Sequence, residues 1–158
     1  MKKILIHITI AAILLTAGLA GITQRAAADQ VYHTEHLVLE PVGGAPLKAG
    51  FVNNIHPNGP VVFAHEVYQL NGAAPLTSYQ VVLMVHPEYS YCAGTPLMVF
   101  PTAVLVTNKS GNGKAEAFFT PEDIDALDAH GLTFDMQWLV KNGNTVDYQT
   151  GCTVVTLD

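Results

Sequence analysis

The segment FAHEVYQL, residues 63–70, contains a His–Glu pair, and the H-E-x-x-H signature of zinc proteases begins in this way. That signature needs a second His four positions after the first, so that both imidazoles lie on one helix face. Position 69 is Gln, and the segment is rich in Val, Phe and Tyr between two Asn-Gly turns, which favours a strand. We therefore predict that His65 and Glu66 lie on opposite faces of a strand and are hydrogen-bonded at the rim or edge of a sheet.

Histidine is frequent in residues 29–158, which contain six His beside only four basic residues. Neutral imidazole is a common ligand for Zn or Cu, and three or four can form a site from different strands. The candidate ligands are His33, His36, His56, His65 and His86. His33 and His36 are three apart, which sends them to opposite faces of a strand. A His-ligated Zn or Cu site is therefore one hypothesis for this chain.

Other catalytic chemistries have little support in the sequence. The nucleophile motif G-x-S-x-G and the phosphate loop G-x-x-x-x-G-K are both absent. Asp123, Asp125 and Asp128 do not follow the pattern of a calcium-binding EF-hand loop. Tyr89 and Tyr91, in the loop-like segment YSYC, place two aromatic rings where they could contact a sugar or a protein.

The first 28 residues have the features of a secretory signal peptide. A short basic start precedes an apolar run, and Ala26, Ala27 and Ala28 provide the small-residue cleavage site. We expect cleavage after Ala28 and a secreted, extracellular protein of residues 29–158, although the apolar run is also long enough for a retained membrane anchor. In an exported protein the two cysteines, Cys92 and Cys152, are expected to form a disulfide bond.

The charge of residues 29–158 restricts the possible partners. This part contains four Lys, no Arg and 13 acidic residues, which gives a formal net charge of −9. Such a chain repels phosphate backbones and anionic lipid surfaces, so nucleic acid and membrane partners are not expected after signal cleavage.

Short apolar runs alternate with turns rich in Gly, Pro and Asn along this part, which is typical of an all-β protein. The expected strands are near 31–40, 48–55, 61–70, 78–86, 97–107, 113–119, 133–141, 145–149 and 152–157. The alternation is clearest in FDMQWLV, where Phe134, Met136, Trp138 and Val140 share the apolar face. One short crossover helix is expected near 121–129, because Thr120 and Pro121 form a helix start and Gly131 a stop.

These elements predict a single antiparallel β-sandwich domain over residues 29–158, in an immunoglobulin- or fibronectin-like arrangement. Three segments, YQLNGAAPLTSYQVVL, FFTPEDIDAL and TGCTVVTLD, resemble stretches of secreted bacterial β-sandwich proteins of no established function. The resemblance implies fold and export, and it carries no catalytic motif.

The sequence as a whole favours a secreted, non-catalytic β-sandwich module without a cofactor. Its role would be structural or the binding of a protein or glycan ligand. The alternative is a small secreted metalloprotein with Zn or Cu held by His from several strands.

Overall fold

The computed structural model describes residues 33–56, 63–125, 128–129 and 131–157. The expected signal peptide, residues 1–28, and its cleavage after Ala28 lie outside the described residues. Within the described ranges, no helix combines the length and the hydropathy needed to cross a membrane.

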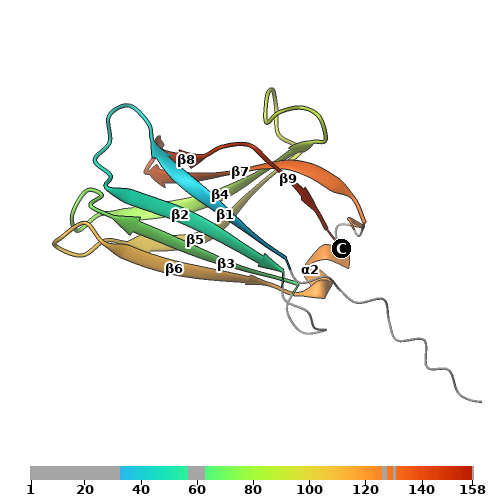
Figure 1. Cartoon of the computed structure of the whole chain (residues 1–158), viewed down its shortest axis with the longest axis horizontal. Coiled ribbons are helices and arrows are strands. Elements are labelled where there is room, and N and C mark those ends of the chain that lie inside the picture. Colours follow the sequence, from blue (N-terminus) through green and yellow to red (C-terminus); the bar gives the residue numbers. More distant parts are fainter. Residues whose placement is uncertain (1–32, 57–62, 126–127, 130, 158) are drawn as a thin grey trace, which may run out of the picture.

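Nine strands and one short helix make up the described chain, and each strand overlaps one that the sequence predicts (Figure 1). The strands are β1 His33–Pro41, β2 Ala49–His56, β3 Ala64–Asn71, β4 Ser78–Pro87, β5 Met98–Val106, β6 Gly113–Phe119, β7 Thr133–Asn142, β8 Thr145–Thr150 and β9 Thr153–Thr156. The period-two alternation and the turn residues between runs account for this agreement.

The helix α2, Pro121–Asp125, is shorter than the expected 121–129. Its start is the one that the sequence predicts: the backbone N–H and the hydroxyl of Thr120 both donate to the carboxylate of Asp123, at 2.8 and 3.1 Å. Asp128 has a φ of 49°, in the left-handed region, so the chain has left the helix by that residue.

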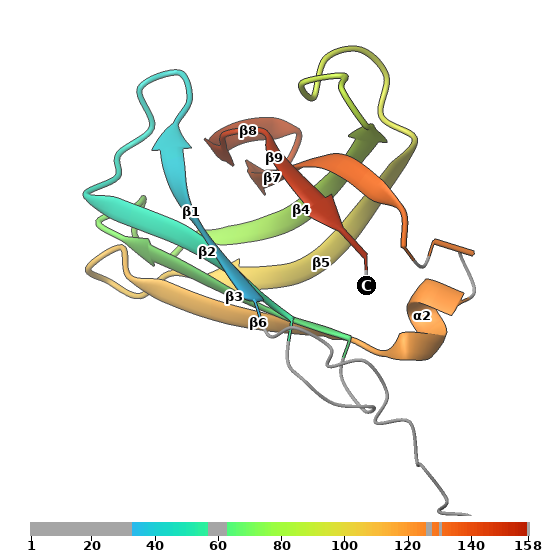
Figure 2. The same ribbon diagram turned by 45° about the vertical axis from the view of Figure 1, so that its right-hand side comes forward.

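All strand pairs are antiparallel, in the order β5-β4-β7-β8-β1-β2-β3-β6, and β9 pairs with β7. Strand β1 joins the two halves, because residues 33–38 pair with β2 while residues 39–41 pair with β8. The all-β antiparallel class is thus confirmed. The immunoglobulin-like sandwich is not confirmed, since the strands form one sheet that curls until it is nearly closed into a barrel (Figure 2).

The two ends of the curled sheet, β5 and β6, meet at the turn of residues 107–112. Gly113 makes this approach possible, because a Cβ there would lie 2.6 Å from a side-chain carbon of Leu105 and 2.8 Å from the carbonyl oxygen of Val106. No ladder of hydrogen bonds joins β5 to β6 among the described residues, so the barrel is incomplete along this seam. Helix α2 lies at the end of the barrel away from the 107–112 turn (Figures 1 and 2).

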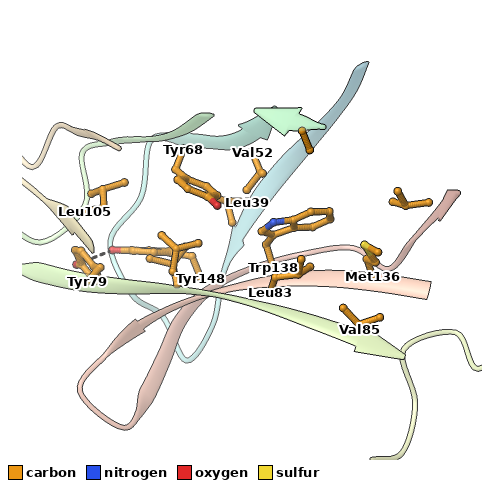
Figure 3. Close-up of a cluster of buried hydrophobic side chains, with 14 of the residues drawn as sticks. Leu39, Val52, Tyr68, Tyr79, Leu83, Val85, Leu105, Met136, Trp138 and Tyr148 are labelled. Carbon is orange, nitrogen blue, oxygen red and sulfur yellow. Dashed lines mark hydrogen bonds between the residues drawn. The ribbon is translucent and has the colours of Figure 1, made fainter. Parts of the chain in front are cut away.

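Large side chains fill the barrel at the end where the 107–112 turn lies. Tyr79 and Tyr148 are fully buried there, with their hydroxyls 3.2 Å apart. Figure 3 shows this core running from Leu105 and Tyr79 past Trp138 to Met136. A barrel of about eight strands is just wide enough for such side chains to fill, or for one small ligand.

Candidate functional site

A cavity of about 390 Å³ occupies the α2 end of the barrel. Its walls come from both halves of the sheet, with eleven apolar residues and four polar ones. The inward side chains at this end include the small residues Ala64, Val85 and Val155, which leave the barrel interior unfilled. The polar lining residues are Asn54, His56, Glu66 and Asp123.

A row of three polar side chains crosses the barrel wall beside the cavity. Glu35 on β1 pairs with Asn54 on β2, and Asn54 pairs with Glu66 on β3. The side-chain amide of Asn54 donates to Glu35 Oε2 at 3.0 Å and lies 3.0 Å from His56 Nε2. Asn54 Oδ1 is buried and has no hydrogen-bond partner among the described residues. Glu35, Asn54 and Glu66 form this row, and Asn54 Oδ1 is a free acceptor within it.

Glu66 is the most deeply buried acid at the cavity, with 2% of its surface exposed. Its Oε2 is hydrogen-bonded to the Tyr68 hydroxyl, which also lies 2.7 Å from Thr102 Oγ1. Burial raises the pKa of Glu66 from 4.5 to about 7, although the Tyr68 hydroxyl and the Trp138 indole partly oppose this rise. The Trp138 N–H has no hydrogen bond of normal geometry, so it acts on Glu66 only weakly.

The predicted strand around His65 and Glu66 is confirmed as β3, but β3 lies between β2 and β6 and is not an edge. His65 points outward, where its Nε2 lies 3.2 Å from Glu116 Oε2 and its ring stacks on Phe118. Glu66 points inward. The expectation that Glu66 sits at a rim or edge is therefore wrong, because closure of the sheet places this residue inside the barrel.

The candidate metal ligands whose side chains the structure describes, His36, His56, His65 and His86, do not form one group suited to a metal ion. His36 is exposed and bonds Asn53, His56 lines the cavity, and His65 lies on the outer surface. His86 is buried on β4, and neither of its ring nitrogens has a hydrogen-bond partner in the described part of the chain. For His33, the backbone register places the residue opposite His56. No group of three or more His, Cys, Asp or Glu side chains suited to a metal ion occurs among the described residues.

The predicted disulfide between Cys92 and Cys152 is present, with the two Cα atoms 5.7 Å apart. It ties the loop of residues 88–97 to the connection between β8 and β9. Asp135, an outward residue on β7, holds the same loop by accepting hydrogen bonds from Ser90 Oγ at 3.2 Å and from the Tyr91 backbone N–H at 2.5 Å. The loop is thus fixed to the outer face at two points.

Tyr89 and Tyr91 project from this loop and are 76% and 82% exposed. Both have a left-handed φ, of 64° and 56°, and so does Cys92, at 55°. Such a backbone costs free energy for residues other than glycine and persists only where the surroundings impose it. The two rings are therefore presented to solvent by a constrained loop.

Comparison with known proteins gave no match to a family model, to a curated protein or to a solved structure.

Proposed function

We propose that this protein is a secreted, non-catalytic binding module that holds a small apolar molecule inside its barrel. The cavity carries the proposal, because about 390 Å³ of space with mainly apolar walls and a few polar groups is typical of ligand pockets. The polar groups lie on one side of the cavity, on β2 and β3, apart from Asp123 on α2. A ligand would thus have one polar end.

The chemistry of the lining also supports binding. Ser, Cys and Lys, three frequent covalent nucleophiles, do not occur among the described residues that line the cavity. Export is supported by the predicted signal peptide and by the disulfide, which forms and persists in oxidising compartments. The resemblance to secreted bacterial immunoglobulin- or fibronectin-like sandwich proteins belongs to this proposal too, and the antiparallel strands support it.

Filling the cavity should abolish binding. Val155 on β9 points into the cavity and is 2% exposed, whereas its neighbour Val154 points outward and is 62% exposed. We expect the neutral dye N-phenyl-1-naphthylamine to bind the protein saturably at one site, with a rise in fluorescence. Val155→Trp should weaken this binding by about tenfold or more, a loss of about 1.4 kcal/mol, while Val154→Trp should leave it unchanged.

Urea unfolding of both variants serves as the control for folding. The proposal fails if the folded protein shows no saturable dye binding, or if the two Trp variants bind the dye equally well.

A second candidate function involves Tyr89 and Tyr91, since exposed and constrained aromatic rings suit contact with a protein or a glycan. Replacing both by Ala should remove retention of the protein on its partner, measured on immobilised polysaccharides and on surface proteins of the source cell. Dye binding in the cavity should not change. Retention of the double variant at the wild-type level would exclude the tyrosines. The alternative of a Zn or Cu protein gains no support from the described histidines.

A further inference from the structure

We propose that the molecule held in the cavity is an apolar amine, bound as its ammonium ion with the charge beside Glu66. This inference rests on the proposed binding function and adds the chemical class of the ligand. It is carried by three features of the cavity: the sign of its charges, its unpaired acceptor atom and the position of that atom beside Glu66 on one wall.

The charged side chains of the cavity favour a cation. Glu66 and Asp123 line it, whereas Lys does not occur among the described lining residues, and residues 29–158 contain no Arg. His56 also lines the cavity, and Glu35, in the same wall as Asn54, places a carboxylate 3.9 Å from its Nε2. A carboxylate ligand, such as that of a fatty acid, would meet like charge at the buried Glu66, where the low dielectric makes repulsion strong.

Among the described lining residues, the buried side-chain atom without a hydrogen-bond partner is an acceptor, Asn54 Oδ1. The Tyr68 hydroxyl is hydrogen-bonded to Oε2 of Glu66 on the same wall. On Asn54 the amide nitrogen makes the bonds to Glu35 and His56, which leaves Oδ1 as the unpaired atom. An ammonium group has three donors and no acceptor, so it matches such a wall, and a carboxylate, with acceptors only, does not.

A cationic ligand would stabilise the buried carboxylate of Glu66. A buried carboxylate without a counter-charge is costly, and an ion pair inside a protein is favourable only when further hydrogen bonds complete it. An ammonium between the Glu66 carboxylate and Oδ1 of Asn54 would supply both the charge and the donors. The apolar body of the ligand would then contact Phe100, Met136 and Val155, which line the cavity from the other half of the sheet.

The test uses three probes that share a ten-carbon chain: decylamine, decan-1-ol and decanoate. Each is titrated at pH 8, below its micelle concentration, against the protein carrying N-phenyl-1-naphthylamine, and also directly by calorimetry. We expect decylamine to bind about tenfold or more tightly than decanol, since a hydrogen bond to a charged group contributes about 1.5–3 kcal/mol, and decanoate to bind most weakly.

Glu66→Gln should weaken decylamine binding by about tenfold or more and weaken decanol binding much less. Glu116→Gln is the matched control, because Glu116 lies on the outer face beside Lys114 and His65. It should change neither affinity.

The outcomes separate this inference from the proposed function. If decanol or decanoate binds as tightly as decylamine, the ammonium ligand is overturned while the binding function stands. If neither the dye nor any probe binds, both fall. An equal loss of decylamine and decanol affinity in Glu66→Gln would also overturn the inference, because Glu66 would then shape the cavity without acting as a counter-charge. Should that variant not fold, the order of the three probes on the wild-type protein decides.

Discussion

Replacing Glu66 by Gln is expected to stabilise the protein at pH 8 by about 3 kcal/mol while changing its stability little at pH 4. The carboxyl has a pKa of about 7 in the folded protein, against 4.5 for the ordinary group, because burial disfavours its charged form. Between pH 4.5 and about 7, the Glu66 carboxyl is deprotonated in the unfolded chain and stays protonated in the folded chain. The free energy of unfolding therefore falls as the pH rises from about 4.5 to about 7, and a neutral Gln removes that loss.

Urea unfolding of both proteins at pH 4, 6 and 8 measures this effect. The difference in free energy between wild type and Glu66→Gln should increase with pH. Glu116→Gln provides a contrast of opposite sign, because the hydrogen bond from Lys114, and then the one from His65, lower the pKa of Glu116. That variant should show no gain at pH 8. A constant difference between wild type and Glu66→Gln across the pH range would mean that Glu66 is not held protonated by burial.

Removing the disulfide is expected to lower the free energy of unfolding by about 4 kcal/mol, because the bond closes a loop across a sequence separation of 60 residues. The measurement is urea unfolding of the double variant Cys92→Ala/Cys152→Ala. The disulfide lies outside the cavity lining, so the folded variant should still bind N-phenyl-1-naphthylamine with near wild-type affinity.

Dithiothreitol offers an internal control for this prediction. The reductant should destabilise the wild-type protein to the level of the double variant and leave the double variant itself unaffected. A loss of less than about 1 kcal/mol would show that the unfolded chain gains little freedom when the loop is opened.

The sequence alone determined the strands and their inward faces. Phe134, Met136, Trp138 and Val140 were predicted to share one apolar face, and all four are buried in the barrel. This prediction succeeds because side chains alternate along a strand with a period of two and turn residues mark its ends, and both signals are local. The disulfide could also be predicted, because a chain expected to be exported and carrying two cysteines offers only one intramolecular pairing.

The tertiary structure decided how the sheet closes and therefore where the site lies. Strand β1 pairs with β2 along residues 33–38 and with β8 along residues 39–41, and this shared strand joins what would otherwise be two sheets. No local pattern encodes that change of partner, because it depends on contacts between strands far apart in the sequence. For the same reason the sequence placed Glu66 at a rim, whereas closure buries it beside a cavity.

On the outer face, too, local alternation does not predict which polar residues are buried. Alternation assigns Asp135 to the side away from the core, and the backbone confirms this, yet Asp135 is only 2% exposed. The 88–97 loop covers Asp135 and donates two hydrogen bonds to its carboxylate. The disulfide from Cys92 to Cys152 holds that loop in place. Local sequence thus determined which residues form strands and which faces are apolar. Long-range pairing and loop placement decided which polar groups are buried, and so where this protein has a cavity with an acid at its wall.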